Sequence, residues 1–426
     1  MSDNFSKIDD LINYIENSPT AWHAVEELKK KLQALSFIEL REKERWDLKP
    51  GQKYFVVRNG SSICAFITPT SVPEKALVVG AHTDSPALKI KPNGEYCQEN
   101  VTMLSVEIYG GPLLSSWLNR DLMIAGKVVY ADAQDNITHR LVHFPDHLVT
   151  IPQLAIHLDR NVNDQGPALN KQLHLNAVAA LNFQGENYLK TLLSSVVKTD
   201  NILSTELFLV PFEKPQRLGF QKEMIASYRF DNLGSAHAAI DGLISESSPK
   251  DHSIKMVMFW DHEEIGSNTT NGAGSPFFMN TLERILLSYN QNREDLHRVI
   301  DQSICLSIDQ AHALHPNYKD KHDPKHAPLL GKGIVIKHNA QQRYATSSET
   351  EAVVVQLCQK HQIPYQKFVS RNDVGCGSTI GPIHATITGM KCVDLGSPQL
   401  SMHSCRELAA CDDHLAMCSL TKAFFE

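Results

Sequence analysis

Apolar residues recur at helical spacing near the start of the chain and in shorter runs farther along. Between residues 5 and 35 they repeat every three or four positions, at Ile8, Leu11, Ile12, Ile15, Trp22, Val25, Leu28 and Leu32. This period is typical of amphipathic helices that bury one face. Pro19, which follows Asn17-Ser18, favours a break between them. The pattern therefore predicts two helices, one on each side of Pro19.

Short apolar runs that end in polar clusters follow this helical region. "KYFVVRNGSSICAFIT" predicts a hairpin with Asn59-Gly60 as its turn. "KALVVGAH" is a continuous apolar run, as expected for a strand buried on both faces of a largely parallel sheet. The same pattern returns in "IKMVMFWDHEEIGS", "SICLSIDQAHA", "KGIVIKHN" and "MKCVDLGSP". "SETEAVVVQLCQKHQI" and "HLAMCSLTKAFF" predict helices between and after these strands.

The region between these two blocks has a different texture. Alternating runs such as "VTMLSVEIYGG", "DLMIAGKVVYAD" and "HRLVHF" predict strands joined by tight turns. Strand–helix alternation on both sides predicts one α/β domain with a mostly parallel sheet, interrupted by a β-rich domain. We expect the α/β domain to comprise residues 1–90 and 220–426, and the β-rich domain to comprise residues 91–219.

Composition and charge exclude some classes of function. The chain has 426 residues, 42% hydrophobic and 21% charged, which is ordinary for a globular protein. A formal net charge of −7 argues against a nucleic-acid partner, because such proteins present a basic face. The sequence lacks an apolar run near the ~18 residues of a membrane helix, and "MSDNFSKIDDLINYIENS" lacks the basic start of a secretory signal. Nine scattered cysteines without a CxxC pair fit a reduced compartment. We therefore expect a cytoplasmic protein without a membrane partner.

Candidate metal ligands stand where the predicted strands of the α/β part end. They are His82 and Asp84 in "VVGAHTDSP", Asp231 in "FDN", Glu263 and Glu264 in "DHEEIGS", Asp309, His312 and His315 in "SIDQAHALHPNY", and His403 in "SPQLSMHSCRE". In an open α/β sheet, ligands bind beyond the carboxyl ends of the strands. Polar groups from several strands can therefore converge on one site.

The donor types favour a catalytic metal centre. Histidine and carboxylates without thiolate suit a catalytic zinc, manganese or cobalt site better than a structural cysteine site. The set exceeds the needs of one catalytic zinc and fits two ions about 3.5–4 Å apart that share a carboxylate. Glu263 and Glu264 would then have separate roles, one binding a cation and the other acting as general base. Asp84 is spaced to orient His82.

Each motif also has an ordinary structural interpretation. His82-Thr83-Asp84 after a strand is often a turn or a helix cap. Adjacent glutamates usually lie on a solvated helix face, Asp231 is a suitable helix N-cap residue, and a single histidine such as His403 is usually structural. Separate structural roles become a poor explanation when the motifs are considered together, because every motif falls at a predicted strand end.

With these motifs in order, the sequence resembles the aspartyl aminopeptidase family of dinuclear-zinc metallopeptidases along nearly its whole length. The motifs that carry the resemblance are "WDLKPGQKYFVVRNGSSICAF", "GAHTDSPALKIKP", "SSWLNRDLMIAGKV", "IPQLAIHLDR", "FDNLGSA", "DHEEIGS", "SIDQAHALHPNY", "VIKHNAQQRYAT", "CGSTIGPI" and "MHSCRE". The resemblance implies an α/β metallopeptidase domain interrupted by a β-rich dimerisation and lid domain.

The resemblance also implies a ligand set. His82, Asp231 and Asp309 would hold one metal ion. Asp231, Glu264 and His403 would hold the other, so that Asp231 bridges two divalent ions per subunit. Zinc is the implied metal, with manganese or cobalt as alternatives.

Roles in catalysis and substrate binding follow in the same way. Glu263 would be the general base, and Asp84 would orient His82. Lys337, in "VIKHN", would meet the acidic side chain of the substrate, a task that suits a compact ammonium. His312 and Tyr344 match positions beside the substrate pocket. Without the resemblance, Lys337 is an ordinary lysine at the end of a strand.

His157, in "LAIHLDR", lies in the β-rich block, apart from the predicted ligands. The resemblance implies that it reaches a neighbouring subunit's site and stabilises the tetrahedral intermediate, as an oxyanion donor does. It further implies a homo-oligomer, a dodecamer built from dimers, that admits small peptides. Taken alone, His157 would be an ordinary core or surface histidine.

The expected activity is hydrolysis of the N-terminal peptide bond, with a preference for N-terminal Asp or Glu. The chain departs from the family pattern at His262, usually Asn, at Asn119, commonly Asp, at Phe230, usually Leu, and at Val374-Gly375. The last departure puts a strict acidic preference in doubt. A broad-specificity aminopeptidase or a deacylase on the same scaffold is the alternative, and a non-enzymatic assembly protein is a third interpretation.

Overall fold

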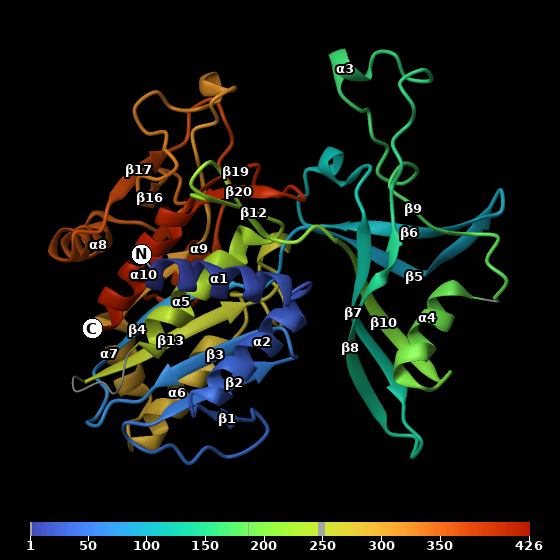
Figure 1. Ribbon diagram of the computed structural model, residues 1–426. Coiled ribbons are helices and arrows are strands. Elements are labelled where there is room, and N and C mark those ends of the chain that lie inside the picture. Colours follow the sequence, from blue (N-terminus) through green and yellow to red (C-terminus); the bar gives the residue numbers. More distant parts are fainter. Residues whose placement is uncertain (1, 186, 246–251) are drawn as a thin grey trace. The chain divides into compact units, whose positions relative to one another are not determined.

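The computed structural model describes residues 2–185, 187–245 and 252–426, and the chain divides into two compact units (Figure 1). The first unit comprises residues 1–84, 215–402 and 407–426, and the second comprises residues 85–214 and 403–406. The expected catalytic domain (1–90 and 220–426) and dimerisation domain (91–219) carry roles that this division does not test, and they stay predictions.

The first unit is built around one large mixed sheet. Its strands run in the order β1 (Ile38–Leu40), β2 (Lys53–Arg58), β3 (Ser62–Ile67), β13 (Ser253–Trp260), β4 (Lys75–His82), β14 (Ile304–Ile308), β18 (Lys391–Gly396), β16 (Ile334–His338) and β17 (Tyr365–Val369). The central strands β13, β4, β14 and β18 are parallel. The β2–β3 hairpin turns at Asn59-Gly60, both with positive φ, as predicted. The mixed α/β fold expected from strand–helix alternation is confirmed.

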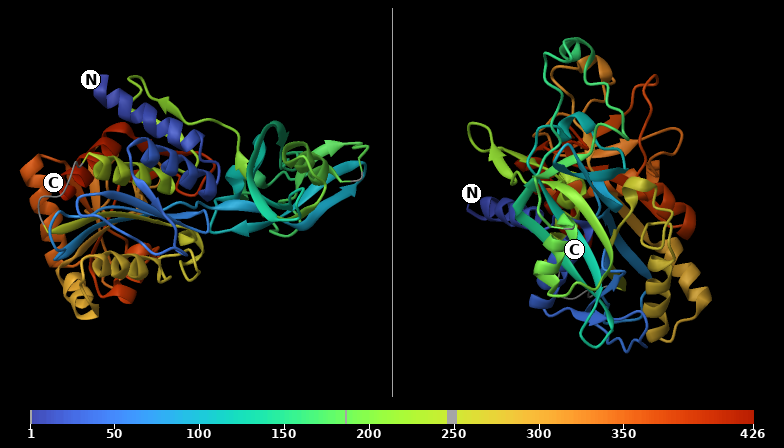
Figure 2. Two further views of the ribbon diagram at one scale, coloured as in Figure 1. Left: turned by 90° about the horizontal axis from the view of Figure 1, so that it is seen from below. Right: turned by 90° about the vertical axis from the view of Figure 1, so that its right-hand side faces the viewer.

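Helices cover both faces of this sheet (Figure 2, left). Alternating strand residues such as Phe55, Val79 and Val257 join a core with α2 (Ala21–Ala34), α5 (Phe230–Ile244), α8 (Ser348–His361) and α10 (Cys411–Phe425). Their neighbours Val56, Val78 and Met256 join a second core with α6 (Phe277–Ser288), α7 (Arg293–Gln302) and α9 (Ile380–Thr388). This burial on both faces explains why the strands read as continuous apolar runs.

Two smaller features complete the first unit. The N-terminal helix α1 (Ser2–Glu16) precedes α2 across Pro19, as the periodicity predicted, and packs with α5. A second sheet runs in the order β11 (Gln216–Leu218), β12 (Met224–Ser227), β20 (Glu407–Ala410), β19 (Pro398–Leu400) and β15 (Ala311–His312).

The second unit is an antiparallel sheet. Its strands run in the order β8 (Ile137–Val149), β7 (Leu122–Ala131), β10 (Ile202–Pro211), β5 (Ala87–Gln98), β6 (Val101–Tyr109) and β9 (Ala177–Leu181). The helices α3 (Val162–Gln165) and α4 (Tyr188–Val197) lie between its strands in sequence. The β-rich insertion predicted from alternating runs is therefore confirmed.

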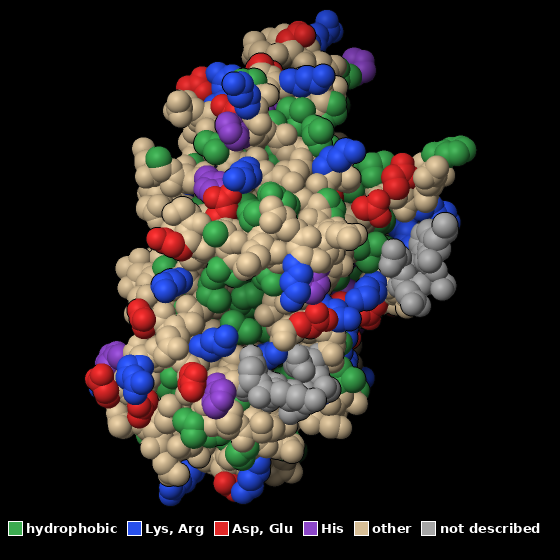
Figure 3. Space-filling model, turned by 90° about the vertical axis from the view of Figure 1, so that its left-hand side faces the viewer, with side chains coloured by type: hydrophobic (Ala, Val, Ile, Leu, Met, Phe, Trp, Pro, Cys, Tyr) green, Lys and Arg blue, Asp and Glu red, His purple; other side chains and the backbone are tan. Residues whose placement is uncertain are grey.

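The surface and the cysteines are as the composition indicated. On the face drawn in Figure 3, Lys/Arg and Asp/Glu side chains are interspersed. All nine cysteines, each within the described ranges, are free thiols. Among the residues the structure describes, none of the helices combines the length and apolarity that crossing a membrane requires. The cytoplasmic location stays a prediction.

Candidate metal centre

His82 is the last residue of β4 and lies at the centre of a group of carboxylates. Its side chain is buried, as is that of Asp84. His82 Nδ1 lies 3.1 Å from the Asp84 backbone oxygen and 3.3 Å from Asp84 Oδ1. These contacts orient the imidazole so that Nε2 points away from Asp84. A ring oriented in this way through its other nitrogen is typical of a ligating histidine.

Two carboxylates from other elements face His82 Nε2. Asp309 follows β14 and Asp231 lies in the first turn of α5. Asp231 Oδ1 is 3.4 Å and Asp309 Oδ1 is 3.5 Å from His82 Nε2. One donor atom from each of these three buried residues lies within 4.8 Å of the others. The structure thus brings together the three residues predicted to hold one metal ion.

Glu263 and Glu264 form a short 3-10 turn after β13. The turn is fixed by Asp84, whose Oδ1 and Oδ2 accept the backbone N–H groups of Glu263 and Glu264, each at 3.1 Å. Glu263 Oε2 lies 3.9 Å from His82 Nε2. Donor atoms of Glu264 and Asp231 lie within 4.8 Å of each other. Asp84 therefore positions both glutamates as well as His82, a dual role that spacing alone did not predict.

The carboxylates in this group repel one another and attract a protonated His82. Burial raises the pKa of Glu263 to about 8, an effect that His82 partly offsets and the carboxylates of Asp309, Asp84 and Asp231 reinforce. Burial favours the neutral form of His82, but hydrogen bonds to Asp231, Asp309 and Asp84 outweigh it and raise the pKa of His82 well above its ordinary value.

The clustering of these carboxylates around His82 bears on whether the residues can hold a metal ion. Clustered carboxylates that are largely removed from water are costly unless a cation or a proton compensates them. The donors are imidazole nitrogen and carboxylate oxygen, which suit a catalytic zinc. The group therefore fits a divalent metal centre, formed by His82, Asp231, Glu263, Glu264 and Asp309, which we call the candidate metal centre.

His262, which stands where the resembling family has Asn, shapes the turn before Glu263. It adopts a left-handed conformation, with φ 65°. Its Nδ1 lies 2.8 Å from Thr269 Oγ1, and its Nε2 lies 3.4 Å from Asp261 Oδ2. The imidazole thus contacts one hydroxyl and one carboxylate.

Two predicted residues, His403 and His157, belong to the second unit. His403 Nδ1 lies 3.1 Å from the Gly111 backbone oxygen, and its own carbonyl accepts the Leu113 N–H. His157 is exposed in the loop after β8, between the exposed side chains of Ile156 and Leu158. Their roles as ligand and oxyanion donor stay predictions.

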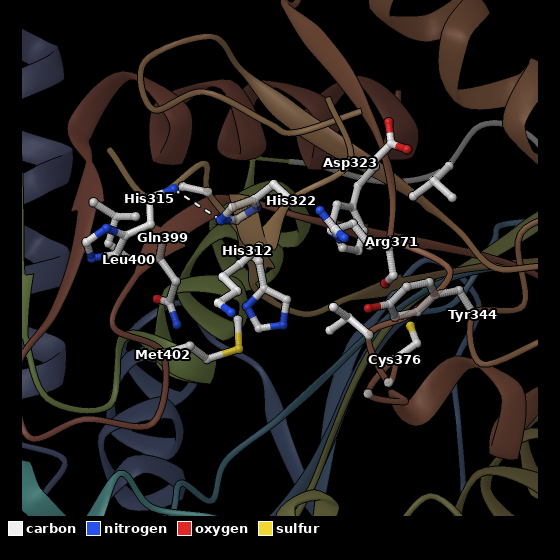
Figure 4. A pocket seen from close by; sticks show the side chains of 18 of the residues that line it. His312, His315, His322, Asp323, Tyr344, Arg371, Cys376, Gln399, Leu400 and Met402 are labelled. Carbon is white, nitrogen blue, oxygen red and sulfur yellow. Dashed lines mark hydrogen bonds between the residues drawn. The ribbon is translucent and has the colours of Figure 1, made fainter. Parts of the chain in front are cut away.

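His312 and Tyr344 line one cavity of about 270 Å³ (Figure 4). The His312 ring stands beside Met402, and Tyr344 lies beside Cys376. Burial raises the pKa of Tyr344 far above its ordinary value, so the phenol stays protonated. Val374 and Gly375, the departure from the family pattern, also line this cavity.

Lys337 is buried at 2% exposure in β16, and its Nζ lies 5.3 Å from the centre of the Tyr344 ring. Tyr344, which lines the cavity, is therefore in contact range of Lys337. Burial raises the pKa of Asp394, and the positive charge of Lys337 partly offsets this rise. A buried ammonium beside an aromatic ring is a suitable partner for a carboxylate.

Sequence reasoning missed two buried acids near these groups. Glu407, in β20, accepts the Asp231 backbone N–H at 2.9 Å. Asp394, in β18, accepts bonds from Ser307 Oγ and Thr379 Oγ1, each at 2.6 Å. A charged residue inside the apolar run "KCVDLGS" was a usable signal for Asp394. Glu407 follows Arg406 in an ordinary polar stretch and gave none.

Known proteins match this chain over nearly its whole length. The family model described as "Aminopeptidase I zinc metalloprotease (M18)" matches residues 14–425. A "Probable aspartyl aminopeptidase" of Ricinus communis is 39% identical over 469 residues, covering 98% of this chain and 94% of that protein. The solved structure "Cryo-EM structure of the Ape4 and Nbr1 complex" has a TM-score of 0.95 at 35% identity, covering 99% of this chain and 86% of that chain. "Structure of S. cerevesiae mApe1 dodecamer" has a TM-score of 0.86 at 27% identity, covering 100% and 97%.

Proposed function

Because this chain belongs to the M18 family of zinc aminopeptidases, we propose that it removes N-terminal Asp or Glu from peptides at a dinuclear metal centre. The family makes the protein a peptidase that uses zinc. The number of ions and the acidic preference are the proposed parts. The convergence of His82, Asp231 and Asp309, with Glu263 and Glu264 alongside, supports the metal centre. The buried ammonium of Lys337 supports the acidic preference.

The residues divide between two ions. His82 and Asp309 would hold one, Glu264 would hold the other with His403 as its predicted partner, and Asp231 would be shared. When bound, the ions would supply Lewis acidity to the scissile carbonyl and to the attacking water. Manganese or cobalt could replace zinc at these nitrogen and oxygen donors.

Glu263 is the proposed general base. Its carboxylate lies 3.9 Å from His82 Nε2, and we assign it to proton transfer rather than to metal binding. Without a metal ion, burial raises the pKa of Glu263 to about 8, so this carboxylate has a high affinity for a proton. A carboxylate with this tendency can take a proton from water and return it to the leaving amine. Asp84 is a positioning residue, since it fixes the Glu263 backbone and the His82 ring.

Lys337 is the proposed determinant of the acidic preference. Its ammonium is buried, and the Tyr344 ring lies 5.3 Å away. A substrate carboxylate that entered this region would meet an ammonium with little competition from water, which strengthens the pairing. A neutral substrate side chain would leave that charge without a substrate partner.

We also propose a homo-oligomer, a dodecamer built from dimers. The loop around His157 exposes Leu154, Ile156 and Leu158, at 57%, 45% and 75%. Neighbouring apolar side chains at this exposure are typical of a protein–protein contact. A similar solved structure is described as a dodecamer. In such an assembly His157 would act in a neighbouring subunit's site.

A reporter panel tests the reaction and its preference together. Aminoacyl reporters of Asp, Glu, Leu, Lys and Ala would be assayed before and after chelation, with zinc, manganese and cobalt added back. Chelator-sensitive release favouring Asp and Glu is the expected result. Metal-dependent release favouring Leu or Ala would retain the centre and reject the acidic preference. No release from any reporter by metal-loaded protein would reject the proposed reaction in favour of a deacylase or a non-enzymatic assembly protein.

A further inference from the structure

A second group of potential metal ligands lies near the amino ends of β14 and β18, away from the carboxyl ends of the strands. Cys305 on β14 and Cys392 on β18 are direct partners in the parallel pairing of these strands. His384, on α9, packs against them. One donor atom from each of the three buried residues lies within 4.8 Å of the others. We call this group the thiol–imidazole cluster.

His384 is the unusual member of this cluster. It is 1% exposed, and both of its ring nitrogens lack a hydrogen-bond partner among the described residues. Its neighbours are aromatic, with the Phe278 ring edge-on at 4.6 Å and the Trp260 ring at 5.4 Å. A buried polar group without a partner destabilises the folded state, and native structures contain few of them. The His384 ring nitrogens are therefore available to bind an ion or a small molecule.

The neighbouring sulfurs indicate which ligand fits. Two thiols and one imidazole form a soft donor set that selects Zn²⁺ or Cu⁺ over hard cations such as Mg²⁺. Burial lowers the pKa of His384 to about 4, so the ring is neutral and has a lone pair to donate. The hydrogen bond with Cys305 and burial raise the pKa of Cys392 well above its ordinary value, so the Cys392 thiol is protonated without a metal.

We propose that Cys305, Cys392 and His384 bind one thiophilic d10 metal ion, Zn²⁺ or Cu⁺, at a site separate from the candidate metal centre. Binding would release the two thiol protons and form two metal–sulfur bonds and one metal–nitrogen bond. The ion would satisfy one His384 nitrogen and would tie β14, β18 and α9 together.

The position of this site gives it a structural consequence. Cys305 and Ser307 alternate along β14, so their side chains lie on the same side of the sheet, and Asp309 follows the end of this strand. Cys305 of the thiol–imidazole cluster thus lies four residues before Asp309 in the chain. An ion there would stabilise the strand that leads to Asp309 and would raise the Tm of the metal-loaded protein.

Cobalt is a probe that separates the two sites. The metal-stripped full-length protein would be loaded with Co²⁺, whose bonds to thiolate give a charge-transfer absorption in the near ultraviolet. The candidate metal centre offers only nitrogen and oxygen donors, so this absorption reports thiolate ligands outside that centre, and substitutions in the thiol–imidazole cluster then assign it. Cys305→Ala and Cys392→Ala should each remove most of it. Cys64→Ala is the matched control, because Cys64 is buried in the same core but lies outside the cluster.

X-ray absorption on the unsubstituted protein gives a test that does not depend on variants folding. Protein loaded with Zn²⁺, or anaerobically with Cu⁺, should show sulfur neighbours at ~2.3 Å. Sulfur in only one of the two samples identifies the ion. A cobalt band that survives both substitutions would belong to other thiols and would overturn the proposal. Metal spectra without sulfur, or a Cys305–Cys392 disulfide in non-reducing peptide maps, would overturn it as well.

Discussion

The candidate metal centre and the thiol–imidazole cluster both draw a residue from the β14 segment, but they use different chemistry. Asp309 and His82 stand where β14 and β4 end, and the loops that follow add carboxylates and backbone N–H groups. Cys305 and Cys392 stand inside strands, where their neighbours are apolar. Burying a charged ligand is costly unless hydrogen-bond partners, opposite charges or water are close. Thiols and a neutral imidazole can be buried among apolar residues at a lower cost. Position along the strand therefore decides which kind of metal site can form.

The largest effect should come from the residue that distinguishes catalysis from ligation. Glu263→Gln removes the proposed base without removing a proposed ligand, so we expect kcat to fall about 10²–10⁴-fold with metal content unchanged. Glu264→Gln is the matched variant, and it should lower the bound metal itself. Steady-state kinetics with elemental analysis measures both. If Glu263→Gln lost metal while Glu264→Gln retained it, the two assignments would have to be exchanged.

The next effect concerns specificity. Lys337→Ala removes the buried ammonium, so the ratio of kcat/KM for Asp over Ala reporters should fall roughly 30-fold or more, as expected for about 2 kcal/mol of a buried charge pair. Lys367→Ala, on the neighbouring strand β17, changes an exposed lysine paired with Glu351 and should leave the ratio unchanged. An unchanged ratio in Lys337→Ala would reject the role of Lys337 in substrate choice.

The two sites also differ in how far the sequence could reveal them. His82, Glu263 and Asp309 follow apolar runs, and the rule that ligands gather at strand ends was enough to predict that they meet. Cys305 and Cys392 are far apart in sequence, and only the β14–β18 register places them opposite each other. The same limit hid Glu407, whose partner Asp231 belongs to another element. Local patterns encode burial and period, but not which distant strands pair.

Gly80 offers a mechanical test, because it lies on β4 between the two sites. A Cβ at this position would lie 2.9 Å from Ile380 Cδ1 and from Trp260 Cζ3, and 3.6 Å from Cys305 Sγ. We expect Gly80→Ala to lower the free energy of unfolding by about 1–3 kcal/mol through overpacking. Gly375→Ala meets open space and should change it by less than about 0.5 kcal/mol. Urea unfolding measures both, and equal values would show that the core around Gly80 accommodates the methyl group.

The smallest effect is expected at His262, where the chain departs from the resembling family. His262→Asn loses the contact with Thr269, which is worth about 0.5–1.5 kcal/mol. Asparagine adopts the left-handed conformation at this position more readily than most residues, which offsets part of that loss. Since the Glu263 and Glu264 backbones are held by Asp84, we expect kcat and metal affinity to stay within about threefold of the starting protein. Titration with zinc and steady-state kinetics measure the two quantities. A change of tenfold or more in either would mean that the imidazole, rather than Asp84, sets the geometry of the candidate metal centre.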